Sequence, residues 1–194
     1  MIISLSGPPG SDMPIKDAAS ILGYNAVPEP NNNPFLIPFY RDPHWSFQSQ
    51  LYFLMGFYKL ISLEDAICER NIHESMLIAR AQLESEYMQP PEYQLLKSVY
   101  EELSPIWPDL IIIIDVPPSV TSSRLLTRQK PSELTQDYGN GMRYLKKLHD
   151  LYNSWEPECR SIRISHSDLD RRVVGDPGEK LAEIISGWKD QNMP

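Results

Sequence analysis

The stretch "DLIIIIDV" at residues 109–116 limits most strongly what this chain can fold into. Its four consecutive isoleucines leave no polar face, so the segment has to be covered on both sides. A strand of this kind is typical of the centre of a parallel sheet with helices packed on both faces. The segment therefore predicts a buried central strand in an α/β protein.

The rest of the chain alternates between strand-like and helix-like segments. A second buried strand is predicted at Ile2–Ser6, directly before a glycine-containing turn. Weaker strand patterns lie at residues 26–27, Ala66–Glu69 and Ser161–Ser165. Helical patterns lie between them, at about 15–22, 45–62, 72–85, 90–103, 118–128, 137–154 and 177–189. This alternation predicts a single α/β domain over residues 1–194, with a central, mostly parallel sheet flanked by helices.

Composition and charge exclude several classes of protein. The net charge of −8 argues against sequence-independent binding to DNA or RNA, which relies on a basic surface. The two cysteines, Cys68 and Cys159, lack the spacing of metal ligands and suit a reducing compartment. The N-terminus lacks a signal-peptide pattern, and no apolar run approaches the roughly 20 residues of a membrane span. We therefore expect a cytoplasmic protein without a membrane or nucleic-acid partner.

The turn after the first predicted strand, "SGPPGSDMPIK", has the position of a phosphate-binding P-loop but not its chemistry. The pattern G-x-x-x-x-G-K-[ST] begins at Gly7, and Gly10 lies inside the turn. Its last three positions hold Asp12, Met13 and Pro14. Met13 brings no charge, Pro14 brings neither hydroxyl nor N–H, and the Asp12 carboxylate would repel a phosphate. The sequence thus predicts a degenerate P-loop.

Asp12 also suggests a positive role for the altered turn. Aspartate is favoured as a helix N-cap, and proline is tolerated in the first helical turn. A carboxylate there would satisfy the free N–H groups and the dipole of the helix that follows. We therefore expect Asp12 to cap this helix and to supply internally the negative charge that a phosphate otherwise supplies. Lys16 lies nearly one helical turn beyond the lysine position of the pattern, and it is an alternative candidate for the missing lysine.

Several separated segments together resemble the deoxynucleoside kinase family, the P-loop enzymes that phosphorylate the 5′-hydroxyl of deoxynucleosides. "LGYNAVPEPNNNPFLIPFYRDPHWSFQSQLYFL" is similar to the family's segment from its first helix through its substrate-binding helix. "ICERNIHES" is similar to its Asp/Glu-Arg-Ser motif, and "SPIWPDLIIIIDVPPSVTSSRLLTRQKPSE" resembles its Pro-Asp-Leu strand, helix and arginine-rich lid. "YLKKLHDLYNSW" is similar to the helix after the lid. The resemblance covers nearly the whole chain and implies a three-layer P-loop-kinase fold, a lid at about 124–135 and a homodimer.

The resemblance also implies catalytic residues. Glu29 matches the family's general base, a carboxylate that takes the proton of an attacking 5′-hydroxyl. Arg70 matches the arginine beside the reacting phosphoryl group, and Glu69 matches a residue that helps to hold Mg²⁺. Asn71 stands in place of the family's usual serine. A surface carboxylate at Glu29, and a buried ion pair between Glu69 and Arg70, are the structural alternatives.

Further matches outline a pocket for a deoxynucleoside or nucleotide. Gln50 matches the glutamine that recognises the nucleobase, for which its amide offers both a donor and an acceptor. Tyr40 matches a tyrosine that contacts the sugar 3′-hydroxyl. Trp45 and Phe47 match aromatic walls of the pocket, although each could equally be a core residue.

The lid contains the remaining matches. Arg124 and Arg128 match positions that bind phosphate oxygens, which suits the planar fork of a guanidinium group. Lys130 stands where a second lid arginine is common, and Glu133 matches a glutamate that reaches the sugar. From composition alone, the segment from residue 124 to 133 could also be a solvated helix end.

These residues favour a deoxynucleoside-kinase-like pseudoenzyme that keeps a nucleoside or nucleotide pocket but lacks the P-loop lysine and hydroxyl. An active nucleoside kinase that holds ATP through Arg70, Arg124, Arg128 and Lys130 is the first alternative. ATP and Mg²⁺ are implied as cofactors only in that case. A non-catalytic subunit of a larger complex is another alternative. A thymidylate-kinase-like enzyme fits less well, because the Glu-Pro pair and the Trp-to-Gln spacing favour nucleoside kinases.

Overall fold

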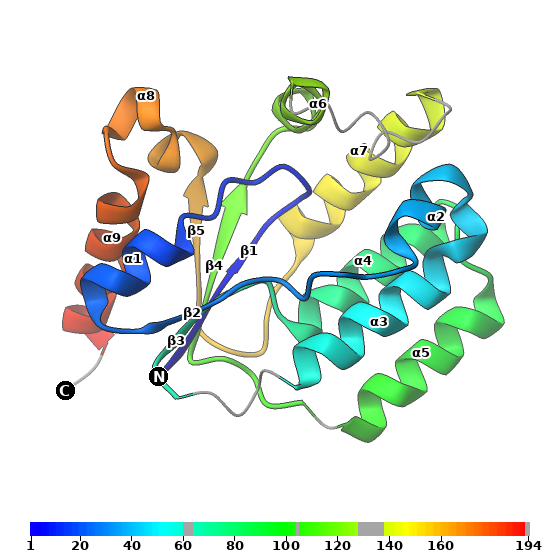
Figure 1. Cartoon of the computed structure of the whole chain (residues 1–194), viewed down its shortest axis with the longest axis horizontal. Helices are drawn as coiled ribbons and strands as arrows, with labels where there is room; N and C mark the ends of the chain where they lie inside the picture. Colours follow the sequence, from blue (N-terminus) through cyan, green and yellow to red (C-terminus); the bar gives the residue numbers. More distant parts are fainter. Residues whose placement is uncertain (60–63, 104, 128–137, 193–194) are drawn as a thin grey trace.

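The computed structural model describes residues 1–59, 64–103, 105–127 and 138–192. Within these residues, a five-stranded sheet with the order β2-β3-β1-β4-β5 lies at the centre (Figure 1). Each neighbouring pair of strands is parallel. The strands are β1 (Ile2–Ser6), β2 (Asn25–Val27), β3 (Ala66–Glu69), β4 (Leu110–Asp115) and β5 (Ser161–Ser165). The predicted α/β fold is confirmed, with a sheet that is parallel throughout.

The isoleucine run forms β4 and lies between β1 and β5, as its lack of a polar face predicts. Successive side chains of a strand point to opposite faces of the sheet. Ile112 and Ile114 belong to the hydrophobic cluster on one face, whereas Ile111 and Ile113 belong to the cluster on the other. All four are at most 1% exposed. The run is apolar throughout because both faces are covered.

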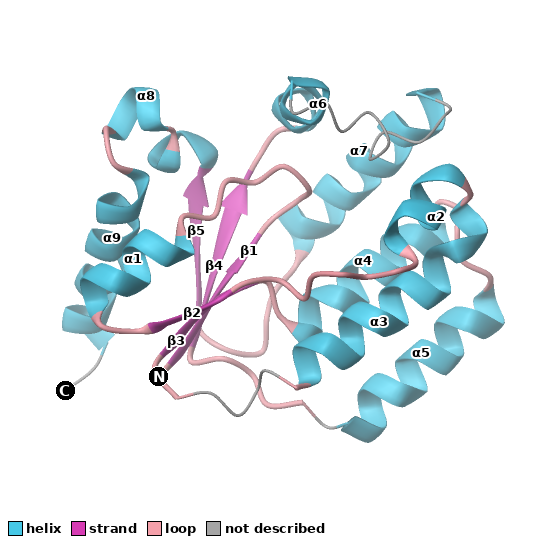
Figure 2. Cartoon of the chain, in the orientation of Figure 1, coloured by secondary structure: helices cyan, strands magenta, loops and turns pink. Residues whose placement is uncertain are grey.

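Helices cover the sheet on both sides (Figure 2). On one face, α1 (Ile15–Leu22) and α9 (Pro177–Asn192) pack against each other and the strands. On the other face lie α4 (Ile72–Glu84) and α7 (Tyr138–Ser154). Outside α4, the helices α3 (Ser46–Tyr58) and α5 (Pro90–Leu103) enclose a third cluster. α6 (Pro118–Thr127) lies beyond the carboxyl end of β4. No helix in the described ranges is long and apolar enough to cross a membrane.

The sequence did not predict the short helices. These are α2 (Leu36–Arg41), α8 (Arg171–Val174) and two 3₁₀ turns at Pro43–Trp45 and His166–Leu169. The helix predicted at 45–62 runs from Ser46 to Tyr58 with Lys59 as its C-cap, and residues 60–63 lie outside the described part of the chain. The single-domain organisation stays a prediction.

Candidate active site

A cavity of about 430 Å³ lies where the carboxyl ends of β1 and β3 meet α3, α4 and α7. Ligands of open parallel sheets bind at this edge of the sheet. Five residues that the sequence predicts for the site line the cavity: Glu29, Tyr40, Gln50, Glu69 and Arg70. The loop after β1 contributes Gly10 and Met13 to the same lining.

Arg70 connects several polar residues around this cavity. It follows β3 directly with a φ of 68°, and its N–H donates to the carbonyl of Leu5 at 2.8 Å. A left-handed conformation is costly for a residue other than glycine, and such strain is concentrated at functional sites. The guanidinium Nε lies 3.5 Å from Glu29 Oε2, while Nη1 donates to Glu74 Oε1 at 2.6 Å and to the Tyr152 hydroxyl at 3.0 Å. Arg70 therefore connects the expected general base to a buried network.

Glu74 and Tyr152 form the inner part of that network. Glu74 is 1% exposed, and its Oε1 accepts from the N–H of Gly7 at 3.1 Å and from the Tyr152 hydroxyl. Burial raises the pKa of Glu74, and the charge of Arg70 opposes this shift. Burial also opposes the charge of Arg70, but Glu74, Tyr152 and Glu29 raise its pKa well above the usual value. The arginine is thus held as a cation at the cavity.

Asn71, which replaces the serine of the family motif, has a clear structural role. Its side chain accepts from the N–H of Glu74 at 2.9 Å and so caps α4. Its amide nitrogen donates to Ser4 Oγ at 2.8 Å and to Ser6 Oγ at 3.0 Å, both on β1. Asn71, the residue that departs from the motif, therefore links the start of α4 to β1.

The backbone of Glu29 contacts the carboxylate of Glu69 at the cavity. The N–H of Glu29 donates to Glu69 Oε2 at 3.4 Å, and both residues line the cavity. Glu29 therefore faces the cavity and Arg70 rather than lying on an isolated surface turn. In the described part of the chain, no cluster of three or more His, Cys, Asp or Glu side chains could hold a metal ion.

The aromatic residues predicted for the pocket are divided between the cavity and its surroundings. Tyr40 lines the cavity, but Trp45 and Phe47 do not. Trp45 is 39% exposed and stacks on Phe35 at a centroid distance of 5.9 Å. Phe47 packs against the cluster that contains Phe53. The structure therefore places Phe47 in the packing of α3, which was the alternative expected for it.

The loop after β1 turns tightly. A Cβ atom on Gly7 would lie 2.6 Å from Ser11 Oγ, and Gly10 has a φ of 83°. The N–H and hydroxyl of Ser11 both bond to the carbonyl of Pro8, at 3.1 and 2.7 Å. Prolines at positions 8, 9 and 14 remove three of the N–H groups with which such a loop could cradle phosphates. Met13 packs against the hydrophobic cluster of the sheet.

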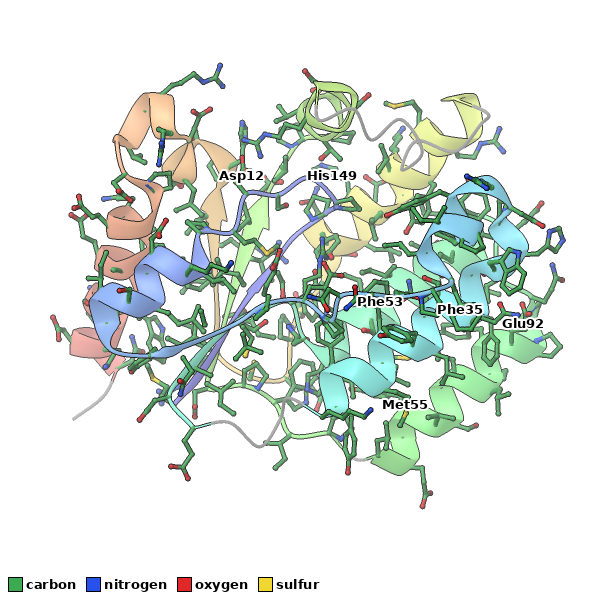
Figure 3. All side chains as sticks on the ribbon, viewed as in Figure 1. Asp12, Phe35, Phe53, Met55, Glu92 and His149 are labelled. Carbon is green, nitrogen blue, oxygen red and sulfur yellow. The ribbon has the colours of Figure 1, made fainter. Side chains whose placement is uncertain are left out.

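Asp12 does not cap the following helix, so that expectation is wrong. The N-cap of α1 is Pro14, whose side chain has no hydrogen-bond acceptor, and no side-chain hydrogen bond caps this helix. The Asp12 carboxylate instead lies 3.5 Å from Nη1 of Arg124 on α6, which also donates to the carbonyl of Gly10 at 3.3 Å. Figure 3 shows Asp12 on the loop, on the side facing α6.

Residues 16–191 match the sequence model of the deoxynucleoside kinase family. The chain belongs to this family. The deoxyadenosine kinase of Dictyostelium discoideum is 28% identical to it over 166 residues, which are 79% of this chain and 64% of that enzyme. The chain thus aligns with less than two thirds of that relative's length.

Solved structures show the same fold. A deoxyadenosine kinase from M. mycoides with the products dCMP and dCDP has a TM-score of 0.78 and 22% identity, over 97% of this chain and 100% of that one. Its dATP-bound structure has a TM-score of 0.76 and 20% identity, over 98% and 99% of the two chains. These structures confirm the three-layer fold implied by the resemblance.

The comparisons leave part of the predicted site open. The deoxynucleoside kinase match begins at residue 16, after the loop at residues 7–14. Arg128, Lys130 and Glu133 lie outside the described residues, so their roles in the lid stay predictions. Lys16 is exposed on α1 and does not line the cavity. The homodimer stays a prediction as well.

Sequence reasoning missed Glu74, Tyr152 and a second glutamine, Gln82. Glu74 lies four residues after Arg70, across the start of a helix, and this spacing brings opposite charges together. The spacing is the sequence feature that could have predicted the contact. Tyr152 is 78 residues from Glu74 along the chain, so no local sequence pattern could predict their contact.

Proposed function

We propose that this member of the deoxynucleoside kinase family binds a deoxynucleoside or deoxynucleotide and has lost ordinary ATP-driven phosphoryl transfer. The observation that carries the proposal is the different partnership of two arginines. Arg70 pairs with Glu29 at the cavity, whereas Arg124 pairs with Asp12 on the loop. Both cations face carboxylates, but Arg70 and Glu29 line the cavity, whereas the carboxylate that faces Arg124 stands on the loop where the phosphates of ATP would bind.

The acceptor side has the groups that nucleoside recognition needs. Glu29 lies at the cavity, where its carboxylate could accept a hydrogen bond or a proton from a 5′-hydroxyl. Arg70 would hold its charge near the oxygens of the sugar or of a phosphate. Gln50 is 5% exposed, and its Oε1 has no hydrogen-bond partner among the described residues. Buried amide oxygens are normally bonded, so this atom favours a polar ligand in the cavity.

The donor side does not fit ATP with Mg²⁺ in the manner of a P-loop. Position 13 has a methionine in place of the lysine, and position 14 has a proline in place of the hydroxyl. The Asp12 carboxylate would face the negative phosphates at the position of the second glycine. At ~4 Å, one pair of like charges costs roughly 1 kcal/mol in water and ~4 at an effective dielectric near 20. The sequence of this loop therefore supports the interpretation that it is a degenerate P-loop.

An active kinase with unusual donor binding is the second candidate. The position of Arg124 favours it, because its Nη1 lies 3.3 Å from the carbonyl of Gly10 and could meet a phosphate if Asp12 moved away. In that case ATP would have to displace the Asp12 carboxylate from Arg124.

Isothermal titration calorimetry separates the two candidates. Deoxynucleosides and ATP with Mg²⁺ are titrated separately into the wild-type chain and into a variant with alanine at positions 12–14. The proposal predicts that a deoxynucleoside binds both proteins equally well and that ATP with Mg²⁺ binds neither tightly. Tight ATP binding that the loop substitutions abolish would contradict it.

A further inference from the structure

A second glutamine, Gln82 on α4, lines the same cavity as Gln50. Gln82 is 1% exposed, and its Oε1 has no hydrogen-bond partner among the described residues. Gln50, on the neighbouring helix α3, is 5% exposed and has an unpaired Oε1 as well. Because buried polar atoms are nearly always bonded, two such oxygens at one cavity indicate a ligand with N–H or O–H donors.

The surroundings of the two amides suit a flat ring. Apolar and aromatic side chains line the cavity with them, including Phe39, Phe53 and Ile78. Phe53 lies on the side of α3 that is turned toward the sheet (Figure 3). An aromatic base could pack between such side chains while its polar edge meets the amides.

Tyr144 lines the cavity together with Gln82. Burial raises the pKa of the Tyr144 hydroxyl, and its interaction with the Gln82 side chain opposes this rise, as an amide N–H directed at the phenol oxygen would. The carbonyl oxygen of Gln82 is left as the group without a partner. Two amide side chains from different helices thus line the cavity, and each has a buried carbonyl oxygen without a partner among the described residues.

We propose that Gln82, together with Gln50, selects an amino nucleobase over its oxo counterpart. Adenine and cytosine carry an exocyclic amino group with two N–H donors, next to ring acceptors, and glutamine recognises this pattern in adenine. Hypoxanthine and uracil carry an oxygen at the corresponding atom, which would oppose the two amide oxygens. This inference deepens the proposed function and rests on it.

Calorimetric titration with two matched pairs of deoxynucleosides tests the selection. Deoxyadenosine and deoxyinosine differ at C6 by an amino and an oxo group, and deoxycytidine and deoxyuridine differ in the same way at C4. The wild-type chain should bind the amino member of at least one pair about tenfold more tightly than the oxo member. The pair that shows this preference tells whether the cavity accepts a purine or a pyrimidine. Gln82→Leu should weaken binding of that amino nucleoside by about tenfold and change the oxo nucleoside by less than about threefold.

Gln48→Leu is the matched control. Gln48 also lies on α3 and has a buried Oε1 without a partner, but it lines a different hollow beside Phe35 and Met55. Its substitution should leave both affinities unchanged. Gln82→Met, which keeps the side-chain length, repeats the test if thermal unfolding shows that the leucine variant is not folded.

The titrations distinguish a failure of the proposed function from a failure of the role proposed for Gln82. If no deoxynucleoside binds the wild-type chain, both the proposed function and the role of Gln82 are wrong. If deoxynucleosides bind but the amino and oxo members bind equally, or Gln82→Leu and Gln82→Met weaken both members equally, only the role of Gln82 is overturned. A preference for the oxo members would overturn it as well.

Discussion

Arg70 and Arg124 show how differently the two halves of this kinase-like site are built. The side chain of Arg70 is 10% exposed and contacts Glu29, Glu74 and Tyr152. The side chain of Arg124 is 18% exposed, and its partner Asp12 is 47% exposed. The proposed acceptor side is therefore joined to the protein core, whereas the loop after β1 meets α6 through an ion pair near the surface.

This difference explains how one half could change without the other. Asn71 connects the network around Arg70 to β1, and Glu74 connects it to Gly7 at the start of the loop, so changes there would disturb the fold. The loop at residues 7–14 forms its own turns and tolerates proline at three positions. Beyond Gly7, we therefore expect substitutions in this loop to cost little stability, so that stability alone would not preserve a phosphate-binding sequence there.

The largest expected contrast is between alanine substitutions of the two arginines. Arg70→Ala leaves the buried Glu74 carboxylate without its cation, so the free energy of unfolding should fall by about 3–5 kcal/mol. Arg124→Ala removes a partly exposed ion pair and should cost about 1 kcal/mol or less. Urea unfolding followed by circular dichroism measures both values. Equal losses would show that the two halves are not built differently.

Tyr152→Phe sharpens the same comparison within the acceptor half. Burial raises the pKa of Tyr152 well above its usual value, so its hydroxyl stays protonated and donates to Glu74. Removal of the hydroxyl should lower the free energy of unfolding by about 1–3 kcal/mol.

Tyr24→Phe is the control for that substitution. The Tyr24 hydroxyl accepts from Lys189 at 2.9 Å on the α1 and α9 side of the sheet, away from the acceptor network. In the same unfolding measurement it should cost less than about 1 kcal/mol. If it costs as much as Tyr152→Phe, the buried network contributes nothing special to stability.

The smallest expected effect concerns the charge on the loop. Asp12→Asn frees Arg124 from its carboxylate partner and removes a negative charge from the phosphate position. Binding of inorganic pyrophosphate should strengthen by roughly fivefold, which corresponds to about 1 kcal/mol. Calorimetry at low ionic strength measures the change, with Asp17→Asn on the exposed face of α1 as the control. An equal gain in both variants would indicate a general charge effect.

The sequence predicted the sheet well, because the features that define it are local. The isoleucine run, the short apolar stretches of β1 and β3 and the alternation of polar residues with isoleucine in β5 are visible as patterns along the chain. α2 was missed because it has only six residues, contains Pro38 and ends just before Pro43. Such a short segment offers too few turns for a helical period to appear.

The site was predicted less completely, because resemblance identifies motif residues but not their supporting contacts. Glu29 and Arg70 were expected in the site, yet Tyr152 joins Arg70 across 82 residues of chain. The Asp12 cap was wrong for a related reason. A residue type favoured at N-caps does not decide between the helix N–H groups and an arginine from another helix.

Phosphoryl transfer from labelled ATP to deoxyadenosine and to deoxycytidine tests the central claim most directly. Three proteins are compared: the wild-type chain, Glu29→Gln, and a variant in which positions 12–14 are changed to Gly-Lys-Ser. The proposed loss of phosphoryl transfer predicts that the wild-type chain transfers no more label than Glu29→Gln does, and that the Gly-Lys-Ser variant transfers more. Transfer by the wild-type chain that disappears in Glu29→Gln would contradict the account.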